Sequence, residues 1–491
     1  MLYKYALSFI ILLLCCSFSG RCSEEARASN LIIKNIEIKG NRKTREKVIL
    51  RELRFKAGDT IPAAVIMDEI EFSRLNVFNL GLFKDVKMNI SEWEEDSLTV
   101  TIDLIERWYY IPAPIFKLTD RNFNVWWVDY DHDFSRTIYG LFYSQDNVTG
   151  NNDLLRLGFY TGFSQAVSVM YNFPHINKKQ TLGIEAFFRF DRNKSFEYIA
   201  NGNKHVFYTS NEFVRKIFHT GAVLRYRKEV HDEQYFGLFF RSTSLNDNIL
   251  ELDSNNYFLN DDLRQNFFQF NYRFERDYRN IQAYPTKGYQ WSIEVEKLGL
   301  GIYNDVDFFN IYGSVSKFID IGKNFYGSGL IRTKISAPAL QPYYNQRGLG
   351  YDQDFVRGYE FFVIDGQQYV FTRANIKHNF LNFNMRNPLM KDVRIGSIPF
   401  QFFIKGFVDL GYVSDETYFK NNPLNNSLLI GGGLGLDIVT LYNNVFRIEY
   451  SLSKANGLDG KKVENGLYLH FVLDISDDMR TLKRARYLDP K

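Results

Sequence analysis

The chain has 491 residues, enough for a small domain and a large barrel, and its 60 basic and 57 acidic residues leave a net charge of only +3. A nucleic-acid-binding protein needs a concentrated basic patch, and the basic cluster at residues 483–486 of the C-terminal tail is small, so we expect no nucleic-acid partner. Aromatic residues make up 17% of the chain, which is a high share.

Residues 1–22 are predicted to be a secretory signal peptide. Lys4 supplies the positive start, residues 6–14 form a short apolar core, and small residues follow. A lipidated Cys22 is the alternative, although residues 19–21 are a poor lead-in for lipidation. The three cysteines of the chain all lie within this range: Cys15, Cys16 and Cys22. The body of the protein is therefore expected to have no disulfide framework, no thiol nucleophile and no cysteine-based metal site.

Residues 31–107 predict a small α/β module with the order β-α-α-β-β. Thr44 suits the N-cap of the first helix, and Pro62 is a favoured first residue for the second. The expected elements are residues 31–39, 44–53, 62–76, 86–90 and 98–104. Two helices on one face leave the strand edges open, and open edges accept extended peptides. A plain spacer domain is the alternative for this module.

This module resembles a single POTRA domain over its whole length. The matching residues are Ile38-Lys39-Gly40-Asn41, Arg51-Glu52-Leu53, Gly58-Asp59, Leu80-Gly81-Leu82-Phe83-Lys84-Asp85-Val86 and Glu106-Arg107. Residues 108–114 follow with two prolines and three aromatics, which favours a stiff connector at a membrane interface.

Residues 108–475 consist of strand after strand with a period of two, and they predict an antiparallel transmembrane β-barrel. Along residues 446–452, for example, apolar and aromatic side chains alternate with Arg447, Glu449 and Ser451. A soluble sandwich also alternates, but the aromatic faces and the lack of covering helices favour a barrel in lipid. The count is about 16 strands: ten before a long loop, one more at 110–118 or 203–211, and five after the loop.

The long loop at residues 336–367 carries the motif Phe355-Val356-Arg357-Gly358-Tyr359. A structureless connection of this length in a compact domain usually has a function. Arg357 offers a rigid fork of donors that suits a fixed carboxylate, and Gly358 permits a sharp turn beside it. An ordinary solvated arginine is the alternative for an isolated motif of this kind.

The strands around this loop indicate a partner for Arg357. By the apolar-out rule of membrane barrels, Phe407, Asp409 and Gly411 face the lumen on one strand, and Glu449 faces it on another. An arginine folded into that lumen would meet carboxylates that the barrel wall screens from salt. Gly-rich residues 431–435 lack the lysine and helix of a phosphate cradle, and small residues on a barrel strand permit close backbone approach.

The barrel as a whole resembles the outer-membrane assembly and secretion superfamily that includes BamA, TamA, the two-partner secretion transporters and the mitochondrial sorting-and-assembly barrel. Three motifs carry the resemblance: Arg276-Asp277 with Pro285-Thr286-Lys287-Gly288, Phe355 to Tyr359, and Phe407-x-Asp409-x-Gly411. The resemblance implies that the loop motif folds into the lumen and is received by the wall motif. The chain departs from the family in its single POTRA and in the charged tail at residues 476–491, where family barrels end on an aromatic residue.

The sequence carries none of the short motifs of metalloproteases, α/β-hydrolases or P-loop enzymes, so we expect no enzyme, no cofactor and no catalytic or metal site. The acidic segment at 245–263 lacks the spacing of a calcium loop and predicts a solvated outer loop.

The predicted function is insertion, assembly or translocation of polypeptides at the outer membrane of a Gram-negative bacterium. The POTRA domain would capture clients in the periplasm. The expected partners are unfolded outer-membrane or secreted polypeptides, the lipid bilayer, and periplasmic chaperones or accessory lipoproteins. Two alternatives remain open: a dedicated secretion pore for a separately encoded partner, and a passive outer-membrane channel.

Overall fold

The structure is a computed structural model, and it describes residues 30–118, 131, 133–247, 257–259, 262–303, 305–351, 354–386, 397–440, 444–454 and 463–472. The predicted signal peptide, the C-terminal tail and much of the acidic segment at 245–263 lie outside these residues. Within the described ranges, no helix is long and apolar enough to cross a bilayer.

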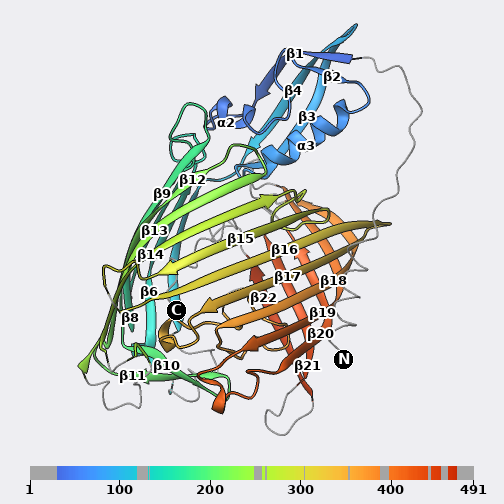
Figure 1. Ribbon diagram of the computed structural model, residues 1–491. Coiled ribbons are helices and arrows are strands. Elements are labelled where there is room, and N and C mark those ends of the chain that lie inside the picture. The colour runs from blue at the N-terminus through green and yellow to red at the C-terminus, as the bar shows by residue number, and fades with distance from the viewer. Residues whose placement is uncertain are drawn as a thin grey trace.

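The N-terminal module is a four-stranded sheet in the order β2-β1-β4-β3 with two helices (Figure 1). Strand β1 runs parallel to β4, and the other neighbours are antiparallel. The elements are β1 (Asn30–Lys39), α2 (Glu46–Leu50), β2 (Thr60–Pro62), α3 (Ile66–Phe78), β3 (Phe83–Glu94) and β4 (Ser97–Glu106). Among the described residues β3 has a ladder partner on one side only, so this 12-residue strand is an open edge.

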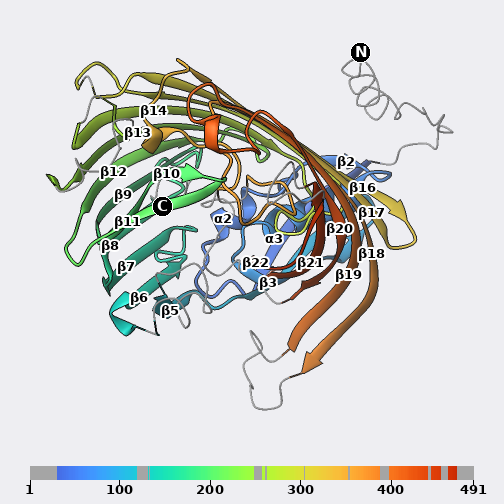
Figure 2. The same ribbon diagram turned by 90° about the horizontal axis from the view of Figure 1, so that it is seen from below.

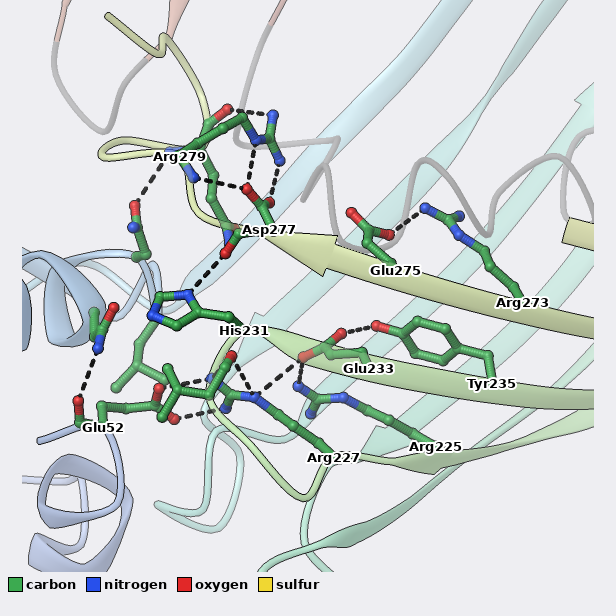
Figure 3. A pocket seen from close by; sticks show the side chains of 15 residues that line it. Glu52, Arg225, Arg227, His231, Glu233, Tyr235, Arg273, Glu275, Asp277 and Arg279 are labelled. Carbon is green, nitrogen blue, oxygen red and sulfur yellow. Dashed lines mark hydrogen bonds and ion pairs between the residues drawn. The ribbon is translucent and has the colours of Figure 1, made fainter. Parts of the chain in front are cut away.

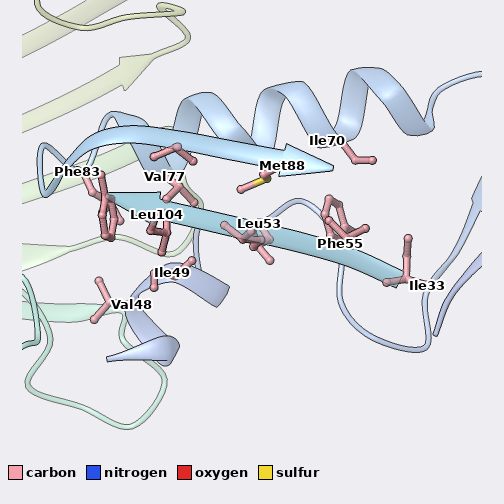
Figure 4. Close-up of a cluster of buried hydrophobic side chains, with 14 of the residues drawn as sticks. Ile33, Val48, Ile49, Leu53, Phe55, Ile70, Val77, Phe83, Met88 and Leu104 are labelled. Carbon is pink, nitrogen blue, oxygen red and sulfur yellow. The ribbon is translucent and has the colours of Figure 1, made fainter. Parts of the chain in front are cut away.

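The core of the module lies between the sheet and its helices. Val48 and Ile49 of α2 and Val77 of α3 are fully buried against the sheet (Figure 4). Ile66 and Ile70 lie one helical turn apart on α3, and both are buried, as the spacing of four residues predicts. The apolar periodicity therefore placed both helices on the correct face.

The helix boundaries differ from the sequence prediction at two places. Thr44 is not an N-cap: it is buried, and both its backbone N–H and its hydroxyl donate to Glu106 Oε1 at 2.7 Å. The carboxylate at the end of β4 takes the hydroxyl that a cap would use, and α2 starts only at Glu46. Pro62 closes the short strand β2 instead of opening a helix, because residues 60–62 pair with β1.

The remainder of the chain forms one 16-stranded antiparallel sheet in which sequential strands are neighbours, and the predicted barrel fold is confirmed. The strand at 110–118 belongs to this sheet, whereas β10 (Ser195–Asn201) and β11 (Lys204–Thr209) form a separate hairpin. The 16 strands are β5 (Tyr110–Leu118), β6 (Thr137–Asp146), β7 (Leu154–Gly162), β8 (Ser164–Phe173), β9 (Leu182–Asn193), β12 (Arg215–Tyr226), β13 (Asp232–Leu245), β14 (Arg264–Asp277), β15 (Gly288–Leu298), β16 (Phe308–Gly322), β17 (Phe325–Ala337), β18 (Gln368–Arg386), β19 (Ser397–Ser414), β20 (Leu428–Val439), β21 (Val445–Lys454) and β22 (Val463–Val472).

The sheet curls around a central space, but its two end strands remain unpaired with each other (Figure 2). Among the described residues, β5 pairs only with β6 and β22 only with β21. Residues 108–114 are therefore not a plain connector, because the strand starts at Tyr110 and contains both Pro112 and Pro114. Proline has no N–H to donate, so it is tolerated on a sheet edge where that donor would face away from the ladder.

The two faces of the curled sheet differ as the alternation predicts. On β19, Ile404 and Val408 point outward and are 51% and 55% exposed, while Lys405 and Asp409 point inward and are buried. The outside is thus apolar and the inside polar, which is the pattern of a barrel in lipid.

A glycine pair tests the packing of the N-terminal module. Gly40 has a φ of +91°, and a Cβ there would lie 2.0 Å from the carbonyl oxygen of Leu104. Gly58 has nearly the same φ, +92°, with open space around it. We expect Gly40→Ala to destabilise the module clearly more than Gly58→Ala, which carries only the backbone strain of about 1 kcal/mol. Limited proteolysis of residues 30–107 in the full chain measures the difference, and equal protease sensitivity would contradict this packing.

Candidate functional site

The loop between β17 and β18 folds back along the inside of the sheet and places its tip against β19, β20 and β21. Tyr359 is 2% exposed, and its hydroxyl donates to the carbonyl oxygen of Lys454 at 2.5 Å. Gly358 adopts a φ of +95°, and its carbonyl accepts a hydrogen bond of 2.9 Å from Ser453 Oγ. The turn at Gly358 therefore lets the chain reverse while Arg357 and Tyr359 point into the wall on either side.

Arg357 is the centre of a buried set of polar contacts. Its Nε and Nη2 donate to the two carboxylate oxygens of Asp409 at 2.8 and 2.5 Å, and its backbone N–H donates to the same carboxylate at 3.1 Å. Nη1 donates to Asn375 Oδ1 at 2.8 Å and to Glu449 Oε1 at 3.3 Å. The guanidinium also lies 3.8 Å above the ring of Phe407. A lysine has no planar fork with which to make these contacts together.

Glycines in the wall permit the loop backbone to come this close. A Cβ on Gly431 would lie 1.9 Å from the carbonyl oxygen of Arg357. A Cβ on Gly411 would lie 2.5 Å from a methyl group of Val356. The structure thus brings together Val356, Arg357, Gly358 and Tyr359 with the wall residues predicted from the sequence, and Phe355 lies beside them, under the guanidinium of Arg373 at 4.5 Å.

Two further charged residues belong to the same network and were not singled out from the sequence. Lys405 Nζ lies 2.6 Å from Glu449 Oε1 and 2.5 Å from Asp437 Oδ1, and both Lys405 and Asp437 are buried. The alternation along β19 could have identified Lys405, because it shares the inward face of this strand with Asp409. Asp437 sits on β20 opposite Arg447 of β21, and only the register between these strands brings it to Lys405.

The motif at the start of β15 lies at the opposite end of the barrel, and its residues do not touch the loop tip. Arg276 makes a two-bond ion pair with Asp232, and Asp277 pairs with Arg279. Gly288 has a φ of +106°, and a Cβ there would clash with the carbonyl oxygen of Tyr278.

Beside Pro285, the neighbouring Tyr284 points into the lumen and its hydroxyl donates to Asp437 Oδ2 at 2.8 Å.

The turn that carries Tyr284 also contacts the N-terminal module. Asn79, at the end of α3, donates through Nδ2 to the carbonyl oxygen of Asn280 at 3.0 Å and accepts from the backbone of Gln282 at 3.2 Å. A row of contacts therefore runs from the module through this turn to Asp437, Lys405, Glu449 and the loop tip.

A second junction between module and barrel lies in a polar pocket at the rim (Figure 3). Glu52 of the module and Arg227, in the turn after β12, form two hydrogen bonds of 2.7 Å, and both side chains are buried. Arg51 donates to the carbonyl oxygen of Arg227 at 2.8 Å. Burial alone raises the pKa of Glu52, but the charge and hydrogen bonds of Arg227 outweigh burial, and the net pKa is lowered.

Two histidines near this junction have pKa values below the ordinary 6.5. Burial, together with the charges of Arg51, Arg225 and Arg227, lowers the pKa of His175 to about 3, against a small opposing effect of Glu52. Burial also lowers the pKa of His231, although its ring Nδ1–H donates to the carbonyl oxygen of Asp277 at 2.7 Å and this bond partly opposes the effect of burial.

Loops cover the other end of the barrel. Asn203, at the tip of the β10–β11 hairpin, accepts from the backbone of Val363 at 2.9 Å and donates to Asn425 Oδ1 at 2.8 Å. Figure 2 shows the hairpin lying across the barrel end. An aromatic cluster packs beneath it: Phe196, Tyr257, Phe258, Tyr343 and Tyr344. In the part of the chain that the structure describes, no group of three or more His, Cys, Asp or Glu side chains is placed to hold a metal ion.

Comparisons with known proteins agree with this architecture. A family model for the POTRA domain, described as surface antigen variable number repeat, matches residues 31–107. CdiB from Escherichia coli superposes with a TM-score of 0.51 at 10% identity, over 90% of this chain and 75% of that chain. BamA from Haemophilus ducreyi lacking POTRA domains 1–3 gives a TM-score of 0.47 at 14% identity, over 90% of this chain and 84% of that chain. No curated protein matches the chain in sequence.

The fold and the matched module define the class: a single POTRA domain followed by a 16-stranded barrel. CdiB from Escherichia coli shares this fold.

Removal of Arg357 tests the buried network. Arg357→Ala leaves Asp409 buried without its main partner, which typically costs ~3–5 kcal/mol. Arg357→Lys should recover only part of the loss, because lysine keeps the charge and not the fork. The Arg357→Ala/Asp409→Ala double variant should be less damaged than the sum of the single variants, with a coupling of roughly 0.5–3 kcal/mol. Thermal unfolding in detergent compares the wild type with these three variants and with Asp409→Ala, and additive losses would mean that the two residues act independently.

The junction should weaken in mild acid. A histidine whose folded pKa is depressed contributes stability that is complete above its ordinary pKa of 6.5 and is lost as the pH falls towards about 3. Between about pH 6.5 and 5 we therefore expect easier proteolysis between module and barrel. Glu52 remains ionised there, since its pKa lies below the ordinary 4.5. His175→Gln should flatten the pH dependence in part, and His175→Gln/His231→Gln further. If the pH dependence of proteolysis is unchanged in the double variant, groups other than these two histidines cause the weakening.

Proposed function

We propose that the protein resides in the outer membrane of a Gram-negative bacterium, with its POTRA domain in the periplasm, and inserts or translocates polypeptides. The observation that carries this proposal is the loop tip held inside the barrel by Arg357 and joined, through Lys405, Asp437 and Tyr284, to the turn that touches Asn79 of the POTRA domain. A client bound to that domain has a route of contiguous contacts by which to influence the loop.

The POTRA domain captures the client along its open strand. Strand β3 presents unpaired backbone groups over 12 residues, and an extended polypeptide adds to such an edge by main-chain hydrogen bonds. The side chains near the C-terminal end of β3 are exposed, among them Trp93 at 57%, so no other part of the described chain covers this edge there. Chaperones or accessory lipoproteins that deliver clients would dock on the same domain.

The open side of the barrel favours passage through the lumen over templating on the first strand. Pro112 and Pro114 lie on β5, which pairs only with β6 among the described residues, and proline is accommodated in an edge strand where its nitrogen faces away from the ladder. Two donors are thereby missing from the edge that a client strand would pair with. This observation supports a dedicated secretion pore as the second candidate function.

A passive channel is the third candidate, and the plugged lumen argues against it. The loop tip is buried against the wall, and the β10–β11 hairpin and the loop after β19 cover the outer end. On this proposal, a client or partner opens the path by displacing the loop.

A disulfide that fixes the loop tests this mechanism. The Cβ position of residue 411 lies 2.5 Å from a γ-methyl carbon of Val356, so the two Cβ atoms are at most about 4 Å apart, within the range of a disulfide. We expect Val356→Cys/Gly411→Cys to cross-link on oxidation. Oxidised cells that carry only this variant should lose their client proteins, and a reductant should restore them. The single Val356→Cys variant is the control for oxidation and packing.

The survey of surface proteins in these cells separates the candidates. Loss of many outer-membrane proteins supports insertion, and loss of a single surface protein supports dedicated secretion. An oxidised, fully cross-linked variant that keeps every surface protein would overturn the proposal and leave the passive channel.

A further inference from the structure

Strands β18 and β19 extend beyond the barrel wall as a two-stranded hairpin. They are the longest described strands, with 19 and 18 residues. The ladder of β17 with β18 begins at Phe325–His378, and that of β20 with β19 ends at Gln401–Val439. Residues 383–386 and 397–400 therefore pair only with each other among the described residues, and residues 380–382 have no ladder partner in β17. Figure 2 shows this orange hairpin projecting alone past its neighbours.

The projecting hairpin lies at the end of the barrel that carries the POTRA domain. Strand β18 leaves the lumen loop at Gln368 and runs away from it, so its far end, at Arg386, lies opposite the loop. The turn between β14 and β15 lies at the same end, because sequential antiparallel strands alternate in direction. That turn contacts Asn79 of the POTRA domain.

The ladder sorts the side chains of the hairpin onto two faces. The pairs Leu381–Phe402, Phe383–Phe400 and Met385–Ile398 share one face, and the intervening pairs Asn382–Gln401, Asn384–Pro399 and Arg386–Ser397 share the other. One face is thus entirely apolar. The other carries amides, a hydroxyl and a charge.

The apolar face is exposed and continues the outer surface of the barrel. Leu381, Phe383 and Met385 are 45%, 44% and 46% exposed. Phe402 is two residues from Ile404, which is 51% exposed on the outside of the wall, so both point the same way. The ring of Phe383 stacks on Phe400 and Phe402 at 5.4 and 5.8 Å, and the aromatic surface is therefore preformed.

We propose that this hairpin lies in the periplasmic leaflet of the bilayer, with its apolar face against lipid acyl chains and its polar face towards the headgroups and the periplasm. Continuity with the lipid-facing wall identifies lipid as the occupant. The part of β18 beyond its contacts with β17, residues 380–386, spans roughly 23 Å at ~3.3 Å per residue, and an apolar face of this length calls for a partner that covers it. A register shift between Asn379 and Leu381 supplies the bulge at which the ribbon bends from the wall.

The inference rests on the membrane placement proposed above, and labels at matched positions separate the two. In full-length protein with its three native cysteines changed to serine, a nitroxide is attached at Phe383→Cys, Asn384→Cys or Ile404→Cys, one at a time. The protein is reconstituted in phosphatidylethanolamine–phosphatidylglycerol vesicles. Collision with oxygen, which concentrates in lipid, and with a water-soluble nickel chelate is measured by electron paramagnetic resonance. Phe400→Cys repeats the measurement from the partner strand if the label at 383 prevents folding.

Labels at 383 and 404 should both show high oxygen and low nickel accessibility, and the label at 384 should collide with nickel several-fold more often than its neighbour at 383. If 404 is in lipid while 383 is as open to nickel as 384, the hairpin projects into water and the inference is wrong. If 383 is shielded from both reagents, a second copy covers the face and lipid does not. If 404 itself is open to nickel, the membrane placement fails first.

Discussion

The ion pair between Arg357 and Asp409 is the interaction on which the interior of this protein depends. Both groups are almost completely removed from water, and a buried charge is tolerated only when its partner and hydrogen bonds are in place. The same carboxylate receives the backbone N–H of Arg357, so the contact fixes the loop backbone as well as the side chain. Glu449 then links this pair to Lys405, which also pairs with Asp437 further along the wall.

The two ends of the barrel are closed by different means. At the outer end, Asn203 forms hydrogen bonds to two other loops, and aromatic rings fill the space below. At the inner end, the POTRA domain is held by Glu52 and Arg227 and by the contacts of Asn79. The polar contacts are few and directional, whereas the barrel wall has continuous ladders. Loops and junctions of this kind open at lower free-energy cost than the wall itself.

The barrel wall departs from regular strand pairing at two places around its circumference. One is the seam, where Pro112 and Pro114 remove donors from the edge of β5. The other is the β18–β19 hairpin, which extends beyond the ends of the neighbouring strands β17 and β20 and carries an apolar face. The seam therefore lacks a paired edge, and the hairpin adds apolar surface to the outside of the wall.

The sequence by itself determined the architecture, because side-chain alternation with a period of two reports directly on which face of a strand is buried. It gave the strand number, the inward direction of Asp409 and Glu449, and the loop motif around Arg357. Tertiary structure decided every contact that depends on the register between strands or on which of two partners takes a hydrogen bond. Lys405 and Asp437 meet only because of strand pairing, Thr44 loses its capping role to Glu106, and the length by which β18 exceeds β17 follows from where the ladder starts. Such contacts depend on strand register and on competition between partners, and the alternation along a single strand does not encode either.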